Sequence, residues 1–110
     1  MIRVFVLTKT FETNWKKLGL NDDDLMSLQQ MLLSNTQAGV VIQNTGGLRK
    51  IRIPLEGRGK SGGARVLYVD FVSLEKLYLI TAYSKHHKVD LTDKECFEIR
   101  KLIESLQKEL

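Results

Sequence analysis

The sequence predicts an α+β domain in which helical segments flank an antiparallel sheet, and three observations support this. A length of 110 residues suffices for one hydrophobic core but not for two, which indicates a single domain over residues 1–110. From Leu48 the hydrophobic period becomes two, and three strand-like segments follow one another, as in an antiparallel meander. Before and after them, apolar residues recur at spacings of three and four, which is typical of helices.

The N-terminal part predicts one strand and one short helix. Residues 2–7 are rich in β-branched and aromatic side chains and predict a buried strand. Either Thr8 or Thr10 can cap the helix that follows, and Gly19 can end it in the left-handed conformation. The apolar positions of this helix are Phe11, Trp15 and Leu18.

A second helix is predicted from Asn21, which is a good N-cap residue, to the segment 35–39. Three acidic residues, 22–24, fall in its first turn, where carboxylates favour the positive end of the helix dipole. Consecutive helical side chains point about 100° apart, so these three do not converge on a metal ion. The buried stripe of the helix is expected to be Leu25, Leu28 and Leu32.

The strands of the sheet are expected after a short extended segment at 40–42 and a turn at 44–47. In the first, Ile51 and Ile53 share one face and Lys50 and Arg52 the other. Because Pro54 lacks an N–H, this strand either ends there or lies at an edge of the sheet. The other two strands are predicted at Ala64–Phe71 and Lys76–Ser84.

The C-terminal segment predicts the clearest helix. Thr92 followed by Glu95 is a capping box. Cys96 is interpreted as a core residue and, being the single cysteine, forms no internal disulfide, which favours a cytoplasmic protein. The apolar stripe is Cys96, Ile99, Ile103, Leu106 and Leu110.

Positive charge is concentrated in one stretch, Leu48–Tyr68. It holds six of the 17 basic residues and one of the 13 acidic residues, a net charge of +5. The other residues include 11 basic and 12 acidic ones, a net charge of −1. Such a patch is typical of a phosphate-binding surface. The alternative is a solvated charged hairpin.

Several site classes are excluded by local context. Glycines 57, 59 and 62 match a dinucleotide fingerprint in letters, but a strand follows them instead of a helix. His86 and His87 are adjacent, and with one cysteine they form no zinc spacing. No glycine elbow surrounds a serine, which argues against a nucleophilic triad.

What remains is cationic chemistry on the predicted meander. Its guanidinium groups can stabilise the charge that develops on a phosphodiester under attack, and a lysine with a lowered pKa can act as general base. Tyr83 or Tyr68 can donate a proton or stack on a base. The cations that the strands bring to one surface are Lys50, Arg52, Lys60, Arg65 and Lys85.

Four segments resemble the RelE/HigB toxins of bacterial type II toxin–antitoxin modules. They are residues 48–52 with the glycine-rich basic loop, 64–68, 78–85 and Asp90–Leu91. The resemblance, closest to the HigB-like group, implies an antiparallel sheet with N-terminal helices packed on one face and a C-terminal helix. It also implies a ribosome-dependent mRNA endonuclease that needs no metal or other cofactor. In such toxins the mRNA 2′-hydroxyl attacks the adjacent phosphate.

The same resemblance implies roles for individual residues. Lys50 and Arg52 match the family's basic pair, in which one member can act as general base, and Arg65 matches the arginine that stabilises the transition state. Tyr83 stands in for the family's tyrosine, whose matching position is Thr92 here, or Lys85 or His86 takes the acid role. The predicted catalytic residues are Lys50, Arg52, Arg65, Tyr83 and Lys85. The predicted RNA-binding residues are Arg49, Arg58, Lys60, Tyr68, His86 and Lys88.

The resemblance also implies partners. These are the ribosomal A site with its mRNA and a cognate antitoxin, HigA-like with a helix-turn-helix domain, through which the complex contacts operator DNA. No membrane partner is expected. Two other functions stay open: a ParE-like inhibitor of DNA gyrase, which is expected to lack the assembled cations, and a non-catalytic RNA-binding module, which would need exposed aromatic residues.

Overall fold

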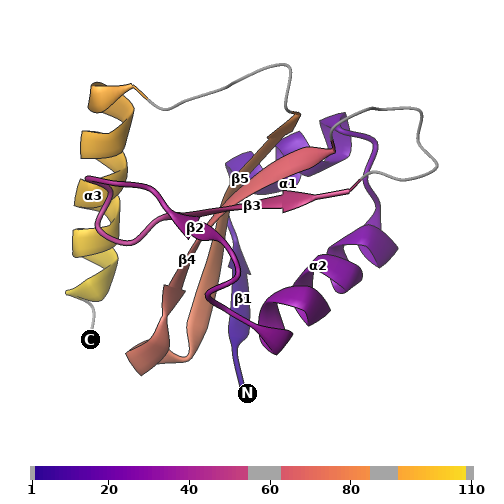
Figure 1. The fold of residues 1–110 in the computed structure, drawn as a ribbon, viewed down its shortest axis with the longest axis horizontal. Helices are drawn as coiled ribbons and strands as arrows, with labels where there is room; N and C mark the ends of the chain where they lie inside the picture. The colour runs from indigo at the N-terminus through magenta and orange to yellow at the C-terminus, as the bar shows by residue number, and fades with distance from the viewer. Residues whose placement is uncertain (1, 55–62, 85–91, 109–110) are drawn as a thin grey trace.

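The computed structural model describes residues 2–54, 63–84 and 92–108. Its elements in chain order are β1 (Val4–Leu7), α1 (Lys9–Lys17), α2 (Asp22–Ser34), β2 (Val40–Val41), β3 (Arg49–Ile53), β4 (Ala64–Phe71), the 3₁₀ helix η1 (Val72–Leu74), β5 (Lys76–Ser84) and α3 (Asp93–Gln107). They form three layers, with α1 and α2 on one side of the sheet and α3 on the other (Figure 1). The predicted α+β fold is confirmed.

The sheet has the strand order β1-β5-β4-β3-β2. Strands β3, β4 and β5 form the predicted antiparallel meander, and β2 extends it with a short antiparallel pair. Strand β1 pairs with β5 in parallel, so the sheet is mixed at this edge. A parallel pair needs a crossover connection, which the long path from β1 through α1 to β5 supplies.

Each face of the sheet has its own hydrophobic core. Toward α1 and α2 the sheet contributes Ile51, Ile53, Val66, Leu77 and Leu79. Toward α3 it contributes Leu48, Leu67, Val69 and Phe71, which cluster with Ile103. Because burial of one such side chain is worth about 1.5–3 kcal/mol, these rows fix the face on which every intervening polar residue lies.

The helix ends follow the sequence closely. The Thr8 hydroxyl accepts a hydrogen bond from the Phe11 N–H and caps α1, and Gly19 follows that helix with φ +77°. Capping boxes begin α2 at Asn21 and α3 at Thr92. Among the helices that the structure describes, none is long and apolar enough to cross a membrane.

Gly63 sets the geometry at the start of β4. Its φ is +68°, and a Cβ atom there would collide with the carbonyl oxygen of Ile53. Only glycine combines a positive φ with this close backbone approach at little cost. The pairing of Ile53 with Ala64, and through it the register of β3 against β4, begins here.

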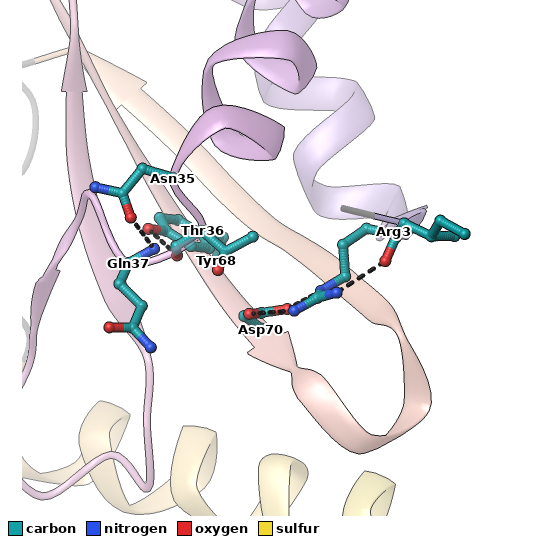
Figure 2. A network of polar contacts seen from close by, with 7 residues as sticks. Arg3, Asn35, Thr36, Gln37, Tyr68 and Asp70 are labelled. Atoms are coloured by element: carbon teal, nitrogen blue, oxygen red, sulfur yellow. Dashed lines mark hydrogen bonds and ion pairs between the residues drawn. The ribbon is translucent and has the colours of Figure 1, made fainter.

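A buried ion pair ties the N-terminus to the far end of β4. Arg3 Nε donates to Asp70 Oδ1 at 2.7 Å and Nη2 to Oδ2 at 3.2 Å, with both side chains less than 10% exposed (Figure 2). The hydrogen bond to Asp70 raises the pKa of Arg3 above its usual value. This bidentate pair spans β5 and fixes β1 at the edge of the sheet.

Candidate active site

Three predicted site residues form a row across the meander. The register places Arg52 of β3 opposite Arg65 of β4, and Arg65 opposite Tyr83 of β5. Directly opposed residues have Cβ atoms about 4.5–5.5 Å apart. The three side chains therefore come from three strands and meet on one surface.

The neighbouring residues establish which surface this is. Ile51 and Ile53, on either side of Arg52, belong to the core under α1 and α2. Because side chains alternate along a strand, Arg52 and its row lie on the α3 face. Lys50, two residues before Arg52, shares this face and lies opposite Leu67 of the α3-side core. We call Lys50, Arg52, Arg65 and Tyr83 the cationic site.

Two members of the cationic site, Lys50 and Arg52, carry charge that no described residue neutralises. Arg52 is exposed, and Lys50 and Arg65 are half-buried. Within residues 2–54, 63–84 and 92–108, the ion pair is that of Arg3 with Asp70, and neither Lys50 nor Arg52 has an acidic partner. Arg65 Nη1 lies 3.5 Å from the carbonyl oxygen of Ala64.

Two arginines directly opposite each other are unfavourable in a protein without a ligand, because like charges on a cross-strand pair repel. A bound anion would relieve this repulsion and accept hydrogen bonds from both guanidinium groups. Guanidinium forks match the geometry of phosphate oxygens and can hold them in two-point contacts. The arrangement therefore suits a phosphodiester better than a neutral ligand.

Tyr83 ends the row and borders a pocket. Its side chain is half-buried and packs against the α3-side core. The pocket beside it has a volume of about 670 Å³ and is lined by residues of α1, β5 and α3, together with Leu67 and the N-cap residue Thr8. Tyr83 is thus the boundary between the charged surface and a mostly apolar recess.

The fold and this surface agree with the comparison with known families. The model of a family described as the RelE toxin of the RelE/RelB toxin–antitoxin system matches residues 2–109. The chain belongs to the RelE toxin family. It is therefore a toxin of a toxin–antitoxin system, as the sequence motifs predicted.

A solved structure supports the same fold. The E. coli toxin RelE, as a mutant with two arginines replaced by alanine and in the free state, is 14% identical and gives a TM-score of 0.55. The match covers 100% of each chain. At this identity the likeness concerns the fold and says nothing of individual residues.

Tyr68, which the sequence analysis assigned to RNA binding, is a core residue of this RelE-family toxin. Its side chain is fully buried, and its hydroxyl donates to the carbonyl oxygen of Thr36 at 2.8 Å (Figure 2). The same hydroxyl accepts from the N–H of Gly39 at 2.9 Å. A Cβ on Gly39 would lie 2.9 Å from the Tyr68 ring. The prediction that Tyr68 contacts RNA is wrong, because no face of the ring is open to a base.

Arg49, also predicted to bind RNA, lies opposite Tyr68 and therefore on the α2 side of the sheet. Its Nη1 donates to the carbonyl oxygen of Gly39 at 2.7 Å and to that of Gln37 at 3.3 Å. This guanidinium holds the segment between α2 and β2, and we leave it out of the cationic site. The sequence alone could have placed Arg49 on this side, because side chains two residues apart on a strand share a face and Ile51 lies in the core under α2.

The remaining predicted site residues lie outside the described residues. These are Arg58, Lys60, Lys85, His86 and Lys88. Their assignments stay predictions. Among the described residues, no group of three or more histidine, cysteine or acidic side chains is placed to hold a metal ion.

The sequence analysis missed the residues that line the pocket from the helices. Asn14 and Thr8 come from the N-terminal part, and Glu98 and Leu102 from α3. They are distant in sequence from the basic stretch, and no motif marks them as site residues. Only the packing of α1 and α3 around the end of β5 brings them together.

Proposed function

We propose that this toxin is a ribosome-dependent mRNA endonuclease that cleaves RNA through its own 2′-hydroxyl. The observation that carries the proposal is the cationic site, in which Lys50, Arg52, Arg65 and Tyr83 share one face across three strands. Membership of the RelE family identifies the chain as a toxin of a toxin–antitoxin system but does not by itself identify the target of the toxin. A phosphodiester is the target that this face suits best.

The proposed reaction is a transesterification. A base takes the proton of the 2′-hydroxyl, the 2′-oxygen attacks phosphorus, and the bond from phosphorus to the 5′-oxygen breaks. The products are a 2′,3′-cyclic phosphate and a 5′-hydroxyl, whose proton comes from a general acid. No step uses a metal or cofactor, because charge stabilisation and proton transfer both fall to side chains.

The positions of the four residues support a division of roles. Arg52 and Arg65 face each other and stabilise the negative charge of the pentavalent transition state. Lys50, on the same strand face as Arg52, is the candidate general base. Tyr83, at the end of the row next to the pocket, is the candidate general acid, and Lys85 and His86 are the alternatives.

The proposed partners follow from the same surface. The ribosomal A site with its mRNA supplies a polyanionic environment in which the positive charge of the toxin favours association. A cognate antitoxin of the HigA-like, helix-turn-helix kind would inhibit the toxin by covering the cationic site with acidic residues. Operator DNA would be contacted through the antitoxin in the complex.

The test is induction of the toxin in bacterial cells, followed by mapping of mRNA 5′ ends. We expect new 5′ ends confined to translated frames and absent when translation initiation is blocked. Growth arrest with intact mRNA would contradict the proposal. It would point to a protein target such as DNA gyrase, which is the ParE-like alternative.

A further inference from the structure

The pocket beside Tyr83 has the size and lining of a ligand site. Its volume of about 670 Å³ lies within the range of about 300–1,000 Å³ that is usual for small-molecule pockets. Leu67, Ile80, Ile99 and Leu102 supply apolar walls, and Leu102 remains 43% exposed. Apolar walls with a few polar groups suit a flat, partly polar ligand such as a nucleobase.

The polar groups on the β5 side of the pocket are held in place. Asn14 Nδ2 donates to Thr81 Oγ1 at 2.9 Å, and Thr8 Oγ1 donates to the carbonyl oxygen of Ile80 at 2.6 Å. These bonds fix α1 against the free edge of β5, where β1 has already ended. The wall that α1 contributes is therefore preorganised.

The wall that α3 contributes carries two carboxylates, Glu95 and Glu98. Glu95 accepts a hydrogen bond from the Thr92 N–H in the capping box, whereas Glu98 is exposed and has no ion pair with any residue that the structure describes. A carboxylate repels phosphate. Next to a bound RNA strand, its position is therefore favourable only if it faces the edge of a base and not the phosphate backbone. There it can accept a hydrogen bond from an exocyclic amino group. Adenine, cytosine and guanine carry such a group, and uracil does not.

The pocket is continuous with the cationic site through Tyr83, which lines the pocket and lies directly opposite Arg65. Neighbouring strands are about 4.8 Å apart. A phosphate held by Arg52 and Arg65 would therefore lie one to two strand spacings from the pocket. This separation matches the distance between a phosphate and the base of the nucleotide attached to it.

We propose that this pocket receives the base of a nucleotide flanking the scissile phosphate, and that Glu98 favours a base with an exocyclic amino group over uracil. The inference rests on the proposed nuclease function and adds to it a subsite and a specificity-determining residue. Asn14 and Thr81 act as positioning residues for the subsite. Glu98 takes no part in the cleavage step.

The experiment uses purified ribosomes programmed with mRNAs whose A-site codon is varied one base at a time. We expect the wild-type toxin to cleave more slowly when uracil occupies one of the two positions that flank the cut. Glu98→Gln should reduce this discrimination about tenfold, because an amide can also donate to a uracil carbonyl and the charge-assisted bond is lost. The matched control is Glu104→Gln, which removes one exposed charge from the same helix but does not line the pocket.

Unchanged base discrimination in Glu98→Gln, or an equal loss in Glu104→Gln, would overturn the inference. So would a Glu98→Gln toxin that keeps its base discrimination but binds antitoxin more weakly, because the pocket would then be a protein contact. Wild-type cleavage at equal rates for all four bases would overturn the inference and leave the nuclease function standing. Absence of cleavage by the wild type would overturn the nuclease function itself.

Discussion

Strand β3 shows two opposite uses of positive charge within two adjacent residues. Arg49 faces the α2 side, where its guanidinium donates to backbone carbonyls of Gln37 and Gly39 beside the buried Tyr68 hydroxyl. Lys50 faces the α3 side, where no described acidic group pairs with it. Polar groups satisfied inside the protein contribute to stability, whereas unneutralised charges are available to a ligand. Substitutions on the two faces should therefore separate into stability effects and activity effects.

The largest effect is expected on the α3 face for Arg65→Ala. Loss of a group that stabilises transition-state charge typically lowers the rate constant by about 100- to 1,000-fold. The free energy of unfolding should change by less than about 1 kcal/mol, because the residue is half-exposed. Ribosome-dependent cleavage and urea unfolding measure the two quantities. Lys16→Ala, which removes an exposed cation from α1, is the control and should leave cleavage within about twofold of wild type.

Lys50→Arg sharpens the role of the lysine on the same face. The substitution keeps the positive charge but replaces a group that can lose its proton with one that stays protonated. If Lys50 is the general base, cleavage should fall about 100-fold, as for Lys50→Ala. If Lys50→Arg cleaves at a near-wild-type rate while Lys50→Ala is inactive, Lys50 contacts phosphate and is not the general base.

On the opposite face, Tyr68→Phe should affect stability and spare activity. It removes the donor to Thr36 and leaves the buried N–H of Gly39 without its acceptor. An unsatisfied buried group costs about 1–3 kcal/mol, so the free energy of unfolding should fall by that amount. Cleavage per folded molecule should stay close to wild type. A folded but inactive Tyr68→Phe toxin would break the proposed separation between the faces.

Arg49→Ala should behave like a weaker Tyr68→Phe. Two hydrogen bonds to carbonyls are lost at a half-exposed site, where water can replace the donor, so we expect a loss of about 1 kcal/mol. The direct comparison is with Arg52→Ala, which removes the same charge from the other face of the same strand. Equal losses of cleavage in both variants would show that total charge on β3 matters more than its face.

The sequence predicted these two faces unequally, and the reasons are physical. Local rules sufficed for the caps at Asn21 and Thr92 and for the bounds of β4 and β5, all of which are confirmed. Period-two alternation also placed Lys50 and Arg52 on one face. The alternation failed for Tyr68 because β4 is buried on both faces, so its pattern does not separate a buried face from an exposed one. The hydrogen-bond partners of Tyr68 also lie about 30 residues away in the sequence, where no local rule finds them. The parallel pairing of β1 and the pocket beside Tyr83 arise from long-range packing, which no local pattern records.

The last expected effect is a pH dependence of stability on the Tyr68 side of the sheet. Burial raises the pKa of Tyr68 above its usual value of 10, and the hydrogen bond from Gly39 and the charge of Arg49 only partly oppose this shift. Below about pH 10 the tyrosine is neutral in both the folded and the unfolded chain, and the contribution to stability is complete. Above that pH the unfolded chain ionises first, so the free energy of unfolding should fall, by at most about 1.4 kcal/mol per pH unit, until the raised pKa of the folded state is reached. The measurement is the difference between the urea unfolding curves of wild type and Tyr68→Phe from pH 8 to about pH 11, in which every contribution that the two proteins share cancels. A difference that stays constant across this range would mean that the Tyr68 hydroxyl ionises as readily in the folded toxin as in the unfolded chain.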